Sequence, residues 1–194
     1  MKNLRIFQVC AAALLCSALS LPLAAQTEVM AWSNMTGVRV DGELIDFESS
    51  LCVGNLKGDM DATGKERQRP RYHREGDTQE VTTTVRGLKF YQKVTDKERG
   101  LVAISIDAAS DTTLNQPAYF CITLDPENYA DAKIKAGGKR LTITSANRKL
   151  DFSFSKSMSA TIEKGRDNTS VYVQLMPSLK KGEKTSVTME LRAS

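Results

Sequence analysis

The chain has 194 residues, of which 27 are basic and 23 acidic, with a formal net charge of +4. The lysines and arginines are spread along the chain, so the sequence shows no nucleic-acid footprint and we expect no nucleic-acid partner. No apolar run reaches the roughly 20 residues that a membrane-spanning helix needs, so we expect no transmembrane segment.

The first 25 residues predict a secretory signal peptide. Lys2 and Arg5 precede an apolar run, and small residues end the segment before Gln26. Removal of residues 1–25 takes away two basic residues and no acidic one, so the net charge falls to +2. We therefore expect an exported protein, in the periplasm, at the cell surface or outside the cell. Residues 26–194 are predicted to form a single domain with a sizeable core.

Residues 37–47, "GVRVDGELIDF", predict a β-hairpin. The dipeptide Asp41-Gly42 is typical of a two-residue type I′ turn, which would pair Val38 with Ile45. In that register the apolar residues of the hairpin share one face: Val38, Val40, Ile45 and Phe47.

Residues 55–70 are charged, contain glycine and have almost no apolar periodicity, so they predict a mobile loop. Asp59 and Asp61 lie in this loop. They lack the longer oxygen series and the final glutamate of an EF-hand calcium loop, and we predict no metal site.

Runs of period-two alternation recur through the rest of the chain, and turn signals separate these runs. The apolar positions are Leu88, Phe90 and Val94, then Val102, Ile104 and Ile106, then Leu150, Phe152 and Phe154, then Val171, Val173 and Leu175, then Val187, Met189 and Leu191. This spacing predicts an all-β fold, an antiparallel β-sandwich of roughly a dozen short strands. A helical turn is expected after Asp125, with Pro126 in its first position.

Cysteine usage leaves two interpretations open. Cys10 and Cys16 belong to the predicted signal peptide, so Cys52 and Cys121 remain in an oxidising compartment. A disulfide between them would close a loop of roughly 70 residues, worth about 4 kcal/mol in the chain-entropy model. Alternatively they are two separate thiols, each a small hydrophobe on its own strand.

No catalytic signature is present. His73 is the only histidine, and neither a Gly-x-Ser-x-Gly elbow nor a phosphate-cradling motif occurs. One histidine and two distant cysteines are too few ligands for a zinc site. We therefore predict no catalytic residue and no cofactor.

Two tyrosines are candidates for carbohydrate binding. Alternation points Tyr91, between Lys89 and Lys93, and Tyr172 away from the apolar faces of their strands. A tyrosine can stack its flat apolar ring on a sugar while its hydroxyl group stays in contact with water. The alternative is that both tyrosines pack against a second layer or a neighbouring domain.

Residues 32–129 resemble a known family in the order of their strands and in their local sequence. The segments are "WSNMTGVRVDGELIDFESSL", "EVTTTVRGLKFYQKVTDKERGLVAISIDAASD" and "AYFCITLDPENYADAKI". They are similar to the N-terminal, supersandwich-like β-sandwich of large secreted glycoside hydrolases of Bacteroidetes. The resemblance implies an accessory domain that supports a catalytic domain, sometimes with sugar contacts. Up to Ser194 we expect no catalytic domain, which leaves an isolated accessory sandwich, a truncated glycoside hydrolase or a stand-alone relative, and no catalytic residue is carried over.

These observations favour a non-catalytic secreted sandwich of a polysaccharide-processing system. Its expected partner is a polysaccharide or a glycan-degrading protein. The alternative is a structural or adhesive envelope protein that pairs its sheet edges with other chains. An enzyme in its own right would need carboxylates that converge in a cleft, and the sequence does not identify such a pair.

Overall fold

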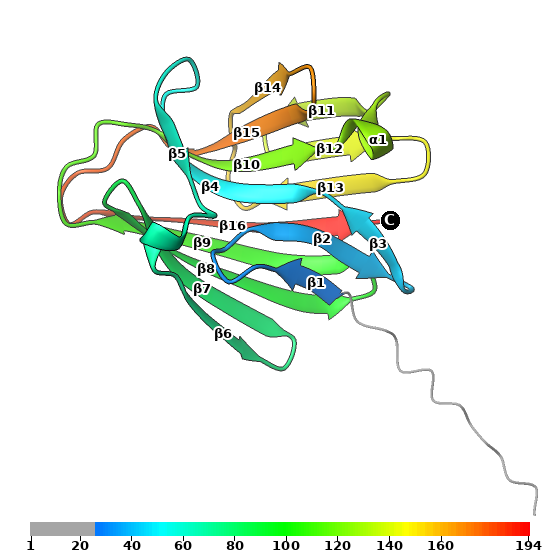
Figure 1. The fold of residues 1–194 in the computed structure, drawn as a ribbon, viewed down its shortest axis with the longest axis horizontal. Coiled ribbons are helices and arrows are strands. Elements are labelled where there is room, and N and C mark those ends of the chain that lie inside the picture. The colour runs from blue at the N-terminus through cyan, green and yellow to red at the C-terminus, as the bar shows by residue number, and fades with distance from the viewer. Residues whose placement is uncertain (1–25) are drawn as a thin grey trace, which may run out of the picture.

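The structure is a computed structural model that describes residues 26–194; the predicted signal peptide, residues 1–25, lies outside the described residues. Sixteen strands form three antiparallel sheets (Figure 1). The all-β sandwich expected from the sequence is confirmed. There are more strands than the dozen predicted, because short strands such as β5 (Met60–Ala62) and β6 (Arg71–Glu75) carry no apolar alternation.

The sixteen strands are divided among a three-stranded, a five-stranded and an eight-stranded sheet. The three-stranded sheet has the order β1 (Gln26–Val29), β2 (Met35–Val40) and β3 (Glu43–Asp46). The five-stranded sheet has the order β14 (Ala160–Lys164), β15 (Thr169–Met176), β10 (Ala118–Leu124), β4 (Glu48–Gly54) and β5. The eight-stranded sheet has the order β11 (Lys133–Gly137), β12 (Arg140–Thr144), β13 (Lys149–Phe154), β16 (Lys184–Ala193), β9 (Leu101–Ser110), β8 (Leu88–Glu98), β7 (Thr78–Val85) and β6.

One contiguous hydrophobic cluster joins the three sheets. The alternating apolar residues of the longer strands point into it, and Phe90, Phe120 and Phe152 are fully buried there. The rings of Phe120 in β10 and Phe152 in β13 meet edge to face with centroids 6.2 Å apart, which links the five-stranded and eight-stranded sheets. The polar partners in the alternation therefore form two outer faces, one on each of these sheets.

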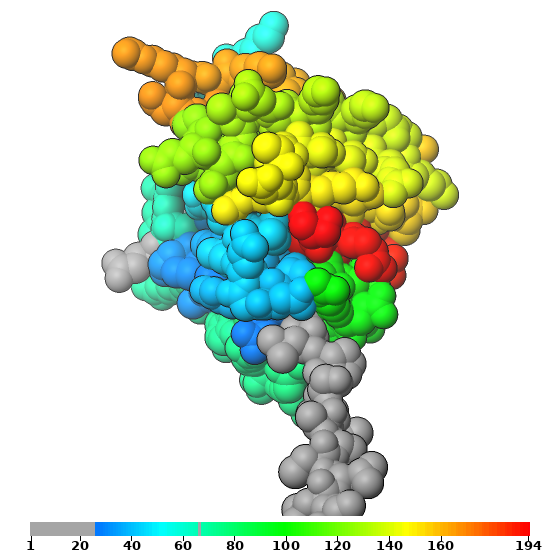
Figure 2. Space-filling model, turned by 90° about the vertical axis from the view of Figure 1, so that its right-hand side faces the viewer, coloured from blue at the N-terminus to red at the C-terminus, as the bar shows by residue number. Residues whose placement is uncertain are grey.

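The predicted hairpin is confirmed in its register. Val38 pairs with Ile45 and Val40 with Glu43. Asp41 and Gly42 have φ values of 53° and 87°, as a type I′ turn requires. The hairpin lies beside the β8–β9 turn and the carboxyl end of β16 at one end of the sandwich (Figure 2), and Arg99 of that turn forms an ion pair with Asp41.

Helices contribute little to the fold. The predicted helical turn is confirmed as α1 (Pro126–Tyr129), where the Asp125 carboxylate accepts a hydrogen bond of 2.8 Å from the amide of Glu127. The other helical element is a 3₁₀ turn, η1 (Glu66–Gln68). Within residues 26–194, no helix is long and apolar enough to cross a membrane.

Buried polar side chains attach β1 to the inner face of the eight-stranded sheet. Asp96 of β8 accepts hydrogen bonds from the amide and the hydroxyl of Thr27, at 3.1 and 2.6 Å. Gln79 Nε2 donates to the carbonyl oxygen of Thr27, and Gln92 Nε2 donates to that of Ser33. These polar residues replace apolar ones on the inner face because the buried backbone of β1 and its turn needs partners there.

Asp96 gives a testable pH dependence. Burial raises the pKa of Asp96 above its ordinary value, although the hydrogen bonds from Thr27 act in the opposite direction. Between the unfolded pKa, about 3.9, and the raised folded value, the native state binds more protons than the unfolded state. Stability from this group therefore falls as the pH rises through that window. In Asp96→Asn the amide oxygen still accepts from Thr27, and this component disappears.

The measurement is urea denaturation of the wild type and Asp96→Asn at several values between pH 3.5 and 7. We expect the free energy of unfolding of the wild type to decline relative to that of the variant as the pH rises. Curves that stay parallel over the whole range would show that the folded carboxyl keeps its ordinary pKa.

Candidate functional site

The two tyrosines proposed from the sequence lie on different surfaces. Tyr91 points outward from β8 in the eight-stranded sheet, where its neighbours Phe90 and Gln92 are buried. Tyr172 points outward from β15 in the five-stranded sheet, between buried Val171 and Val173. Because the inner faces of these two sheets share one core, the tyrosines face away from each other and do not form one site.

A shallow trough runs along the outer face of the eight-stranded sheet beside Tyr91. Strands β8, β9 and β16 lie side by side at the centre of this sheet (Figure 1). Their registers align outward-facing residues in four successive rows: Lys89, Ala109 and Lys184; Tyr91, Asp107 and Ser186; Lys93, Ser105 and Thr188; and Thr95, Ala103 and Glu190. The middle strand carries short side chains and its neighbours carry longer ones. We call this surface the β9 trough.

The β9 trough contains two hollows, one over its first two rows and one over its last two. One, of about 510 Å³, lies at the end with Lys89, Tyr91 and Lys184. The other, of about 490 Å³, lies over Ser105 and is lined by a further set of hydroxyl side chains, from Thr95, Ser153, Ser155 and Thr188. At about 3.4 Å per residue, the floor from Ala103 to Ala109 is roughly 20 Å long. The trough therefore presents hydroxyl groups and one aromatic ring over the length of a short extended ligand.

Tyr91 is half-buried and keeps its proton at neutral pH. Burial raises the pKa of Tyr91 to about 12, and the nearby Glu80 carboxylate adds to the effect. Hydrogen bonding with Tyr91 and Lys93 in turn lowers the pKa of Glu80, so that carboxylate stays ionised. Lys93 and Glu80 form an ion pair of 3.3 Å. The ring of Tyr91 thus lies near the Glu80–Lys93 ion pair and is partly exposed.

The carboxylates of the trough do not converge as a glycosidase pair. Asp107 and Glu190 lie two rows apart, a separation of about 14 Å along the strands, whereas the two carboxyl groups of a glycosidase lie roughly 5 to 10 Å apart. His73 lies on the exposed strand β6, opposite Glu80. Among the described residues, no group of three or more histidine, cysteine or acidic side chains is placed to hold a metal ion.

Tyr172 belongs to a small apolar cluster on the outer face of the five-stranded sheet. Its ring meets that of Tyr119 edge to face, with centroids 6.0 Å apart. Cys52 and Cys121 lie beneath the tyrosines, and Leu56 from the loop after β4 packs against the same cluster. Tyr172 thus packs against side chains of its own sheet face, and both sugar binding there and packing against a second layer or domain stay predictions.

Cys52 and Cys121 are neighbours on adjacent strands. Cys52 of β4 pairs with Tyr119 of β10 and Ser50 pairs with Cys121, so the two cysteines are diagonal to each other on one face. Both are free and buried in the structure. Hydrogen bonding with the Cys121 thiol, and with the Ser50 hydroxyl at 3.4 Å from Cys52 Sγ, lowers the pKa of Cys52. The disulfide considered from the sequence would join these two sulfurs.

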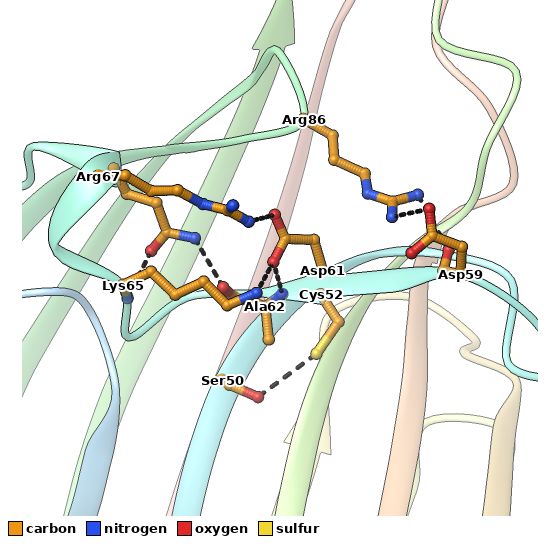
Figure 3. Close-up of polar contacts among 9 residues, drawn as sticks. Ser50, Cys52, Asp59, Asp61, Ala62, Lys65, Arg67 and Arg86 are labelled. Carbon is orange, nitrogen blue, oxygen red and sulfur yellow. Dashed lines mark hydrogen bonds and ion pairs between the residues drawn. The ribbon is translucent and has the colours of Figure 1, made fainter.

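The segment 55–70, predicted as a mobile loop, contains ordered elements. Met60–Ala62 form strand β5 against β4, and η1 follows. The Asp61 carboxylate is held by Lys65 and, at 2.7 Å, by Arg67 (Figure 3), and the hydrogen bond from Lys65 is the main cause of its lowered pKa. Arg86 pairs with Asp59 at 2.5 Å. The acidic pair considered for calcium therefore fixes this segment through ion pairs.

Comparison with known proteins shows the fold of this chain. No family model matches the sequence, and no curated protein matches it. Among solved structures, a polysaccharide lyase has a TM-score of 0.53 at 9% identity, over 88% of this chain and 32% of its own. A heparan sulfate lyase mutant from Pedobacter heparinus and a heparinase III gene product give TM-scores of 0.49 and 0.46 at 11% and 10% identity. Each covers 64% of this chain and 21% of its own.

The chain therefore spans about a third or less of these solved structures. At such low identities the likeness shows the fold alone: this β-sandwich is similar to one part of a polysaccharide lyase. The match supports the coarser part of the resemblance noted from the sequence, a β-sandwich that forms one part of a larger protein.

Sequence reasoning identified Tyr91 with Lys89 and Lys93 beside it, but missed the residues that β9 and β16 contribute to the β9 trough. Lys89 and Lys93 already flanked Tyr91 in the alternation, so one wall of the trough was readable. Its opposite wall comes from β16, which pairs with β9 across about 80 residues of sequence. Nothing in the local pattern of Ser186 or Thr188 indicates which strand lies beside them.

Proposed function

We propose that this chain is an exported, non-catalytic β-sandwich module of a polysaccharide-processing system, and that the β9 trough binds carbohydrate. The observation that carries the proposal is the row of short and hydroxyl-bearing side chains beside the outward-facing ring of Tyr91. Sugars combine hydroxyl groups with flat apolar faces, so they suit a surface of hydroxyl partners and one aromatic ring.

Two further observations support the proposal. The fold is similar to one part of a polysaccharide lyase, an enzyme that acts on polysaccharide as its name states. The N-terminal signal predicted from the sequence would deliver the chain to the compartment where polysaccharides are met. The resemblance of residues 32–129 to the N-terminal sandwich of secreted glycoside hydrolases favours an accessory role beside a catalytic partner.

Affinity electrophoresis of residues 26–194 through gels that contain plant, algal or host polysaccharides tests this function. We expect at least one polysaccharide to retard the wild type, and Tyr91→Ala to weaken that binding by about tenfold, equivalent to about 1.4 kcal/mol. Tyr72→Ala, an exposed tyrosine on edge strand β6, is the matched control and should bind like the wild type. Tyr172→Ala reports separately on the opposite face.

The other outcomes are equally informative. Retardation that Tyr172→Ala abolishes and Tyr91→Ala leaves intact would move the site to the five-stranded sheet. If no polysaccharide retards the wild type, carbohydrate binding is wrong. The exposed edge strands β6 and β14 would then favour a structural or adhesive protein that works by strand addition.

A further inference from the structure

The charges of the β9 trough are distributed unevenly along its length. In the first row, Lys89 and Lys184 flank Ala109 from the two sides. Neither lysine forms an ion pair with any described side chain, whereas Lys93, four residues further along β8 than Lys89, is paired with Glu80. The trough thus has a basic end with two free ammonium groups and a longer stretch lined by hydroxyl groups.

The turn before β16 adds positive charge at the same end. The amide of Gly182 donates a hydrogen bond of 3.0 Å to the carbonyl oxygen of Ser110, which fixes this turn beside the carboxyl end of β9. Lys180 and Lys181 lie in the turn and are exposed, with Glu183 as the acidic residue between them and Lys184. The end of the trough near Ala109 is therefore net positive.

Resting on the function proposed above, we propose that the β9 trough selects acidic glycans. A carboxylate or sulfate group of the ligand lies over Ala109, between the ammonium groups of Lys89 and Lys184. The methyl group of Ala109 leaves room for this anion, and each lysine supplies up to three hydrogen-bond donors from its own side.

Two aspartates lie two residues from Ala109: Asp107 within β9 and the exposed Asp111 just beyond the end of β9. Asp107 lies about 7 Å from Ala109 along the strand, between Tyr91 and Ser186. A carboxylate accepts hydrogen bonds and sugar hydroxyls donate them. Asp107 therefore contacts the next sugar unit, which stacks on Tyr91. The four lysines at positions 89, 180, 181 and 184 outnumber the acidic residues Asp107, Asp111 and Glu183, so this end stays attractive to an anion.

The test uses matched pairs of polysaccharides and matched pairs of lysines. One pair is polygalacturonate and the same chain with its carboxylates reduced to neutral alcohols; the other is a sulfated galactan and its desulfated form. The protein is residues 26–194, as the wild type, as Lys89→Gln/Lys184→Gln, and as Lys133→Gln/Lys135→Gln. The second double variant removes the same charge from β11, on the outer face of the same sheet but four strands from β9.

We expect at least one acidic chain to bind the wild type about tenfold more tightly than its neutral counterpart. Lys89→Gln/Lys184→Gln should lose this preference, and Lys133→Gln/Lys135→Gln should keep it. Raising the salt concentration from 50 to 300 mM should weaken binding of the acidic chain, since the lysines are exposed. A preference within the polygalacturonate pair identifies a carboxylate ligand, and a preference within the galactan pair identifies a sulfate ligand.

Three results would overturn the inference. Equal binding of acidic and neutral chains refutes the anion site and leaves carbohydrate binding in place. An equal loss in both double variants shows that attraction to the whole sheet face, and not the Lys89 and Lys184 pair, holds the ligand. No binding of any chain, acidic or neutral, refutes both the anion site and the proposed function.

Discussion

Replacing Phe152 by alanine is expected to lower the free energy of unfolding by about 3 to 5 kcal/mol. Phe152 is fully buried, and its ring lies against Phe154 of its own strand and against Phe47 and Phe120 from other parts of the chain. Phe120 lies in the five-stranded sheet, and Phe47 follows β3. Removal of this ring leaves a cavity at the point where the layers meet, and the sheets cannot close it without moving together.

Denaturant unfolding of wild type and Phe152→Ala gives this number, provided that the slope m is unchanged. Ile162→Ala is the control, because Ile162 is 39% exposed on the edge strand β14 and its truncation should cost less than about 1 kcal/mol. A loss at Phe152 that is no larger than the loss at Ile162 would mean that Phe152 does not join the sheets in the way described.

The sequence predicted the fold class because the alternation is local. Leu88, Phe90 and Val94 are buried as their spacing indicated. The same face of β8 also carries Gln92 and Asp96, which break the apolar pattern. Their partners, Ser33 and Thr27, lie more than 50 residues earlier in the chain, so the reason for this break could not be read locally.

The candidate site was predictable only in part for a similar reason. Alternation correctly turned Tyr91 and Tyr172 away from the core, but each sits on a different sheet, and the sheet to which a strand belongs depends on pairing at long range. The same holds for Lys184, which faces Lys89 across Ala109 only because β16 inserts between β9 and β13. A single sequence identifies which side chains point outward, and the topology decides which of them meet.

Oxidation of Cys52 and Cys121 to a disulfide is the other change for which we expect a large effect on stability. Their side chains lie diagonal to each other on the same face of adjacent strands. Hydrogen bonds to Cys52 lower its pKa, which favours the thiolate that attacks in disulfide formation. The bond would close a loop of roughly 70 residues and so restrict the unfolded chain, a gain of up to about 4 kcal/mol.

The measurement compares residues 26–194 after mild oxidation and after reduction. The oxidised form should have a mass lower by two hydrogens, no thiol that reacts after unfolding, and a free energy of unfolding higher by up to about 4 kcal/mol. Cys121→Ser separates the bond from the packing, because it loses the gain on oxidation while Cys52 stays in place. If both thiols remain reactive after oxidation, the diagonal placement of the two cysteines on their strands keeps the sulfurs from bonding. Cys52 and Cys121 then act as small hydrophobes beneath Tyr119 and Tyr172.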